Sequence, residues 1–113
     1  MMRVSSLTSA EAFTTKDGSA IRELHHTQGQ SLAEARLDEG QRTERHYHAR
    51  TEEIYFLLEG DGEMEVDGER RRVAAGDAVL IPPGARHQIR ADTALRFLCC
   101  CAPPYSHEDT YFD

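Results

Sequence analysis

The sequence predicts an all-β chain folded as one barrel, and two observations support this. From Ile21 onward, short alternating or apolar stretches are separated by turn residues at intervals of about 8–12 residues, a pattern typical of β-sandwiches and barrels. The chain has 113 residues, which is room for one small domain. About nine short strands in such a domain bury their edges most naturally by closing into a barrel.

Each expected strand is bounded by residues that favour turns. The segments 28–30 (Gln-Gly-Gln) and 38–40 (Asp-Glu-Gly) end the first two strands, and the apolar fourth strand ends at 59–62. Asp67-Gly68 suits a two-residue hairpin because glycine accepts a positive φ. Gly76-Asp77 and the segment 82–84 (Pro-Pro-Gly) form the later turns. In chain order the expected strands are residues 21–26, 31–37, 45–48, 53–58, 63–66, 70–73, 78–81, 87–90 and 95–101.

The two ends of the chain lie outside this pattern. Residues 1–20 are expected to be a short N-terminal extension, 21–102 the single barrel domain and 103–113 a C-terminal tail. The only helix candidate is the segment 7–14, which Ser9 can cap, and it is short. The tail around His107 is expected to be a flexible acidic end, with a flap over the barrel mouth or over a partner subunit as the alternative.

The composition excludes several classes of partner. Asp plus Glu number 20 against 13 Lys plus Arg, a net charge of -7, which opposes binding to nucleic acid or to an anionic membrane surface. The longest apolar run, Phe97 to Ala102, is far below the roughly 20 residues needed to span a bilayer. The N-terminal residues lack the apolar core of a secretory signal. We therefore expect a cytoplasmic protein with no nucleic-acid or membrane partner.

The cysteines Cys99-Cys100-Cys101 are expected to be structural. Neighbouring cysteines make strained bridges, and no distant fourth cysteine offers a disulfide framework. Consecutive thiols on a strand point to opposite faces, which argues against a metal site built on them. A buried strand in a reducing compartment explains them best.

Histidines and one carboxylate make up the candidate metal site. His46 and His48 are two residues apart, so on a strand both rings point to the same face. His87 follows the 82–84 turn, which can deliver a further ligand. Glu53 is five residues after His48, so on a continuous strand it would point to the opposite face. A break at 49–51 lets it return on the neighbouring antiparallel strand. Imidazoles with a carboxylate suit Mn, Fe, Ni, Cu or Zn.

These residues lie in two motifs that resemble those of the cupin superfamily. The first, G-x5-H-x-H-x4-E-x6-G, runs from Gly40 to Gly60, and the second, G-x5-P-x-G-x2-H, runs from Gly76 to His87. The second motif departs from the family at Ala91, where an Asn that supports the following turn is usual. The resemblance implies a small single-domain jelly-roll barrel. It also implies one divalent metal with two adjacent open positions, held by His46, His48, Glu53 and His87.

Glu53 is preferred to Glu52 as the carboxylate because of its spacing to Gly60, although the apolarity of the strand alone favours the opposite phase. With Glu53 inward, Tyr55 also points inward and is a candidate for lining the pocket. Arg50, in the turn between ligands, is a candidate to meet an anionic substrate. The choice turns an apolar row outward, which predicts a homodimer. That row is Ile54, Phe56 and Leu58.

Two classes of function remain open. The resemblance implies a metal-dependent enzyme acting on a small oxygenated substrate. Such an enzyme would be a dioxygenase or an isomerase or lyase, and the chain is also similar to the mannose-6-phosphate isomerase-like group. The alternative is a non-catalytic module that binds a sugar or another metabolite. The intact set of four ligands favours the enzyme, but the fold class alone does not select a reaction.

Overall fold

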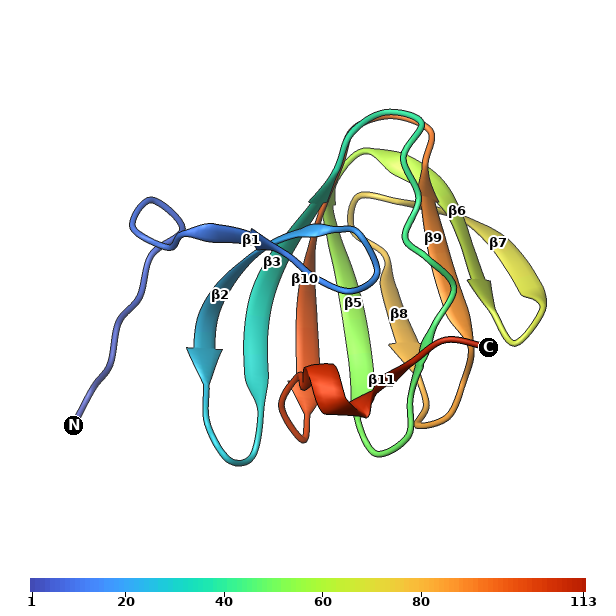
Figure 1. Cartoon of the computed structure of the whole chain (residues 1–113). Helices are drawn as coiled ribbons and strands as arrows, with labels where there is room; N and C mark the ends of the chain where they lie inside the picture. Colours follow the sequence, from blue (N-terminus) through green and yellow to red (C-terminus); the bar gives the residue numbers. More distant parts are fainter.

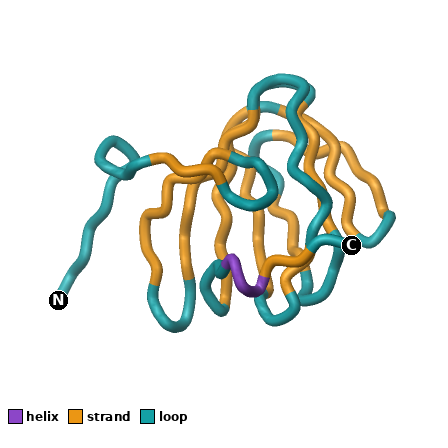
Figure 2. Tube along the Cα trace, viewed as in Figure 1, coloured by secondary structure: helices purple, strands orange, loops and turns teal.

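The computed structural model describes all 113 residues and confirms the all-β prediction (Figures 1 and 2). All nine expected strands form, most of them within one or two residues of their expected ends. The elements are β1 (Ala12–Thr14), β2 (Ala20–His26), β3 (Ser31–Leu37), β4 (Tyr47–His48), β5 (Glu52–Glu59), β6 (Asp61–Val66), β7 (Glu69–Ala74), β8 (Ala78–Ile81), β9 (His87–Ala91), β10 (Leu95–Ala102), the 3-10 turn η1 (His107–Asp109) and β11 (Thr110–Tyr111).

The strands form a jelly-roll barrel from antiparallel sheets. One wall is a six-stranded sheet with the order β1-β2-β3-β10-β5-β8, and the other is a three-stranded sheet with the order β7-β6-β9. The short pair β11-β4 lies at one end of the barrel, where η1 and β11 cross in front of the long strands (Figure 1). We call this end the barrel mouth.

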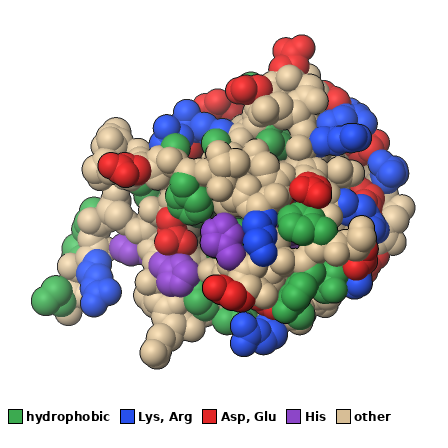
Figure 3. All heavy atoms as spheres, viewed as in Figure 1, with side chains coloured by type: hydrophobic (Ala, Val, Ile, Leu, Met, Phe, Trp, Pro, Cys, Tyr) green, Lys and Arg blue, Asp and Glu red, His purple; other side chains and the backbone are tan.

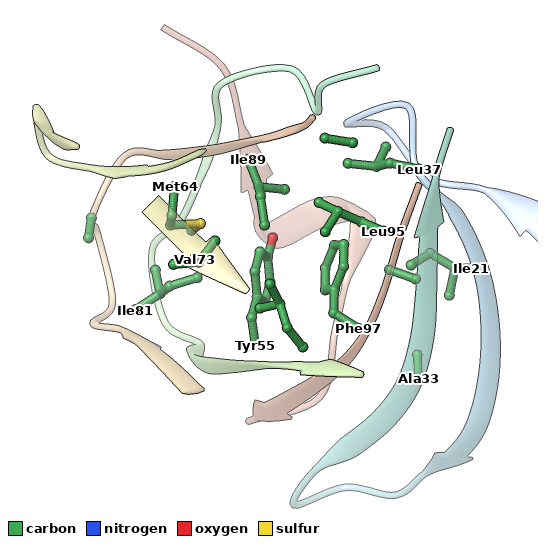
Figure 4. Close-up of a cluster of buried hydrophobic side chains, with 14 residues drawn as sticks. Ile21, Ala33, Leu37, Tyr55, Met64, Val73, Ile81, Ile89, Leu95 and Phe97 are labelled. Carbon is green, nitrogen blue, oxygen red and sulfur yellow. The ribbon is translucent and has the colours of Figure 1, made fainter. Parts of the chain in front are cut away.

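The core fills the space between the walls (Figure 4). It forms because side chains alternate along each strand, as in β5, where Tyr55 and Leu57 are 2% and 0% exposed while Ile54 and Phe56 are 40% and 38% exposed. The inward phase of β5 is therefore the one that includes Glu53. The side chains labelled in Figure 4 are Ile21, Ala33, Leu37, Tyr55, Met64, Val73, Ile81, Ile89, Leu95 and Phe97.

The prediction of a helix over residues 7–14 is wrong, because no helix forms there. The backbone N–H groups of Ser9 and Ala10 donate to Ser6 O, at 3.2 and 3.1 Å, and close a single turn. Residues 12–14 then form β1, which pairs with β2 from Ala12↔Arg22 to Thr14↔Ala20. A helix this short is marginal by itself, so pairing with a strand outside the segment decides the conformation.

The C-terminal tail pairs with the barrel, so the flexible acidic end is wrong, whereas the alternative of a flap over the barrel mouth agrees with the structure. β11 pairs antiparallel with β4, placing Thr110 opposite His48 and Tyr111 opposite Tyr47. Asp109 and Thr110 are 3% and 4% exposed. Fixing these residues requires partners distant in sequence, which the local acidity of the tail did not indicate.

The three cysteines are free and alternate across the six-stranded sheet, as expected. Cys99 and Cys101 lie opposite Tyr55 and Glu53 of β5, on the inner face, whereas Cys100 lies opposite the outward Ile54. No helix in this structure has the length and apolar character needed to cross a membrane.

Candidate metal centre

Three buried histidines converge inside the barrel mouth. One side-chain nitrogen from each of His46, His48 and His87 lies within 4.8 Å of the other two, and the residues are 2%, 5% and 0% exposed. Backbone pairing sets this arrangement, because His46 N donates to His87 O at 3.1 Å and His87 N donates to His46 O at 2.9 Å. His48 follows two residues later, so its ring joins the same face.

All three rings are oriented in the same way. The Nδ1 of each ring lies within hydrogen-bond distance of a backbone carbonyl oxygen. Because a carbonyl oxygen only accepts, each Nδ1 carries the proton, and a neutral ring then keeps a lone pair on Nε2. The carbonyls are those of Glu44 (2.7 Å from His46), Asp109 (3.1 Å from His48) and Ala85 (3.0 Å from His87).

Glu53 completes one side of the cluster. Its Oε1 lies 3.4 Å from His48 Nε2 and 3.5 Å from His87 Nε2, and its Oε2 accepts from Cys101 Sγ at 3.3 Å. Burial raises the pKa of Glu53, but the contacts with His48 and His87 outweigh burial and hold it well below its ordinary value. Glu53 is therefore a carboxylate. Glu53 Oε1 and His87 Nε2 are buried and have no hydrogen-bond partner.

The electrostatics differ between two of the rings. Burial lowers the pKa of His46, and the nearby His87 lowers it further against the opposing charge of Asp17. Burial also acts to lower the pKa of His48, but Glu53 outweighs burial and raises it above the ordinary value. The surroundings of His46 thus favour its neutral form, whereas Glu53 favours the protonated form of His48.

Asp17 is a neighbour of the cluster that the sequence reasoning missed. It lies between β1 and β2, and its Oδ2 is 3.5 Å from His46 Nε2. The sequence around it, Thr15-Lys16-Asp17-Gly18-Ser19, is typical of a turn in which the carboxylate binds nearby hydroxyls. Only the folding of this loop across the barrel mouth brings Asp17 to the histidines.

The pocket at this site contains one of the two expected pocket residues. Tyr55 lines it, together with His46, His48 and Glu53, and its ring packs against Phe97 with the centroids 4.7 Å apart. Arg50 does not line it: its side chain is 75% exposed, and its Nε lies 3.8 Å from Asp109 Oδ1. The break in the chain at 49–51 turns Arg50 outward, so the expectation that it faces a substrate there is not met.

The same face of the molecule carries a second, shallower hollow. Figure 3 shows histidine and acidic side chains close together on this face. The hollow beside η1 is lined by Phe13, Glu23, His26, Tyr105, Ser106, His107 and Glu108. Phe13, Glu23 and Tyr105 also line the histidine pocket, so the two hollows adjoin.

Comparisons with known proteins agree with this fold. The chain is 49% identical, over 87% of its length and 84% of the relative, to an uncharacterized protein of Methanocaldococcus jannaschii. It superposes on KdgF from Halomonas sp. with a TM-score of 0.85, at 21% identity over 96% of this chain and 99% of that chain.

It also superposes on Pac13 from Streptomyces, described as a nucleoside dehydratase, with a TM-score of 0.82. Identity there is 16%, over 98% of this chain and 90% of that chain, and a variant of Pac13 has been solved with uridine. These two likenesses concern the fold. The family follows from the sequence itself: residues 33–101 match the Cupin domain family, and the chain belongs to that family.

Proposed function

We propose that this chain is a metal-dependent enzyme acting on a small oxygenated substrate, as a dioxygenase or as an isomerase or lyase. One divalent ion, of Mn, Fe, Ni, Cu or Zn, would be held by His46, His48, Glu53 and His87. The observation that carries the proposal is the convergence of Nε2 lone pairs and a carboxylate oxygen in a buried pocket, with every Nδ1 already engaged by backbone.

The fit of an ion to this site rests on the buried acceptors. Glu53 Oε1 and His87 Nε2 have no hydrogen-bond partner although both are buried. Leaving such groups unsatisfied costs about 1–3 kcal/mol each. A cation between them satisfies both at once, and imidazole with carboxylate is a donor set that divalent transition metals prefer.

The surrounding residues define what the pocket can do. An ion bound there would polarise a substrate oxygen or lower the pKa of a bound water. Tyr55, Phe97 and Cys99 form an apolar wall that excludes water from one side of the site. Thr15, Ser19 and Tyr105 add hydroxyl groups to the lining, which suits a substrate that carries hydroxyl or carbonyl groups. Pac13 acts on a nucleoside, and small hydroxylated molecules are therefore the first substrates to screen.

Elemental analysis of tag-free protein tests the metal centre. We expect about one equivalent of metal per chain in the wild type, and loss of metal in His46→Ala and His87→Ala. His25→Ala is the matched control, because His25 is exposed and lies outside the pocket, and it should keep its metal. Unchanged metal content in His46→Ala and His87→Ala would refute the ligand assignment. A reconstituted wild type without metal would refute the metal centre and leave the non-catalytic binding module as the function.

We also propose that the chain forms a homodimer through the outer face of the six-stranded sheet. Ile54 and Phe56 of β5 face outward there, and Leu80 of β8, 58% exposed, lies opposite Ile54. Leu98 and Cys100 of β10 lie opposite Phe56 and Ile54 on this face, and exposed apolar patches in folded proteins mark interfaces. The free cysteines suit a reducing compartment, in keeping with a cytoplasmic location.

A further inference from the structure

We infer that Asp17 is a fifth protein ligand of the ion, supplied by the loop between β1 and β2. This inference rests on the proposed metal centre and extends it to a part of the chain outside both sequence motifs. Asp17 Oδ2 lies 3.5 Å from His46 Nε2, a separation comparable to the 3.4 and 3.5 Å between Glu53 Oε1 and the other two rings. Asp17 and Glu53 thus contact different histidines of one cluster.

Only one of the two oxygens of the Asp17 carboxylate accepts hydrogen bonds from the loop. Its Oδ1 accepts from Thr15 Oγ1 at 2.6 Å, from Ser19 Oγ at 2.7 Å and from Ser19 N at 3.0 Å. These three bonds saturate Oδ1 and orient the group, while Oδ2 is left facing the histidines. The Asp17 carboxylate is therefore oriented before any ion binds, as the side chain of a metal ligand needs to be.

The loop is also attached to the segment that positions His46. The backbone O of Asp17 accepts from Glu44 N at 2.7 Å, and the backbone O of Glu44 accepts from His46 Nδ1, also at 2.7 Å. Glu44 thus fixes both the loop and the ring. The spacing of Asp17 Oδ2 from His46 Nε2 follows from this shared attachment and not from the rotamer of a free surface side chain.

With His46 neutral, as a metal ligand must be, the two atoms that face each other are both acceptors. Because His46 Nδ1 donates to a carbonyl oxygen, the neutral ring presents a lone pair at Nε2, and Asp17 Oδ2 presents another. Two lone pairs at this distance repel unless a positive charge lies within reach of both. An ion shared with His48, His87 and Glu53 supplies that charge.

Charge balance leads to the same conclusion. Three neutral imidazoles and Glu53 alone would leave a divalent ion with a net charge of +1 among residues that are 5% exposed or less. A buried net charge is costly. Asp17, with a side chain 12% exposed, brings the site to neutrality. Two carboxylates also favour Mn or Fe over softer ions, and five protein donors leave one place for substrate oxygen on a six-coordinate ion.

The test compares metal binding by wild type, Asp17→Asn and Glu11→Gln. Asn keeps an oxygen to accept from Thr15 and Ser19, so the loop is expected to fold, and circular dichroism of the metal-free proteins checks this. Glu11→Gln removes an equal charge from the same segment at an exposed position. Titration calorimetry with Mn²⁺ should show binding weakened at least about tenfold in Asp17→Asn and changed less than about twofold in Glu11→Gln.

Two further readouts separate ligation from a charge effect. Mn²⁺ should slow hydrogen exchange of the amides of residues 12–19 in wild type and leave it unchanged in Asp17→Asn. With Co²⁺ as the probe, visible absorption should intensify in Asp17→Asn, because the absorption of bound Co²⁺ rises as its coordination number falls.

The outcomes are distinct. Wild-type affinity in Asp17→Asn would overturn the role of Asp17 and leave the four-ligand centre standing. Weaker binding in Asp17→Asn without exchange protection in wild type would also overturn it, because a charge acting through space gives that result. A wild type that binds neither ion, as His87→Ala is expected to behave, would refute the metal centre itself.

Discussion

Replacing Gly60 with alanine tests why the first motif ends in glycine. Gly60 has a φ of +87°, in the left-handed region that costs a non-glycine residue about 1–2 kcal/mol. A Cβ there would also lie 2.2 Å from Ala94 O and 3.1 Å from Leu95 Cδ2. The first of these atoms belongs to the backbone, so the strand connection must move to admit a methyl group.

Gly68 provides the matched control. Its φ is +89°, so alanine meets the same backbone penalty, but a Cβ at Gly68 would have no atom within 4 Å. We expect Gly68→Ala to lower the free energy of unfolding by about 1–2 kcal/mol. Overpacking costs a further ~1–3 kcal/mol, so Gly60→Ala should lose about 2–5 kcal/mol in total.

Thermal and urea unfolding followed by circular dichroism measure both losses, since the chain has no tryptophan to report by fluorescence. At about 4 °C per kcal/mol for a chain of this size, Gly60→Ala should melt about 8–20 °C below wild type and Gly68→Ala about 4–8 °C below. Equal losses in the two variants would refute the argument from contact with Ala94, because only the backbone penalty would then remain.

Three other predictions concern the outer face of the six-stranded sheet and the C-terminal tail. Burial acts to raise the pKa of the fully buried Glu34, but Arg36 and Arg96 outweigh it and lower the pKa. The stability from Glu34 is therefore complete above the unfolded pKa of about 4.3 and is lost as pH falls through the folded value. Urea unfolding should show Glu34→Gln less stable than wild type at pH 7, by about 1–3 kcal/mol, with a difference that shrinks as the pH is lowered below the unfolded pKa; a difference that stays constant would contradict this. Asp109 accepts from the backbone N–H groups of residues 49–51 at 3.1–3.3 Å, and its own carbonyl orients His48. Asp109→Ala should thus reduce stability by ~2–4 kcal/mol and metal affinity about tenfold, as calorimetry can measure, whereas unchanged affinity would show that the tail does not support the ring. Phe56→Glu should convert the proposed dimer to a monomer in light scattering, and a monomeric wild type would refute the interface.

The barrel could be predicted because its signals are local. Turn pairs such as Asp67-Gly68 and Gly76-Asp77 lie between strands that alternate with a period of two, and that period also placed His46 and His48 on one face. The inward phase of β5 required the spacing between Glu53 and Gly60, because the apolarity of the strand favoured the other phase. The structure has Glu53 beside the histidines and Glu52 exposed.

The parts that could not be predicted depend on contacts between distant segments. Residues 12–14 become a strand only because β2 returns beside them, and the tail is ordered only because β4 accepts it. Asp17 has no spacing relation to either motif, so no pattern connects it to His46. Arg50 illustrates the reverse case, since its position between ligands suggested the pocket while the turn directs its side chain to solvent.

The support of His48 by the tail has a consequence for biosynthesis. Its Nδ1 is held by the backbone of Asp109 and the hydroxyl of Thr110, which follow it by 61 and 62 residues. His46, His48 and Glu53 are therefore synthesised long before the residues that orient the His48 ring. A nascent chain carries these three donors without their final arrangement, so the proposed metal centre would lack its selectivity at that stage. In the proposed metal centre, selection among ions would therefore depend on the docking of β11 against β4.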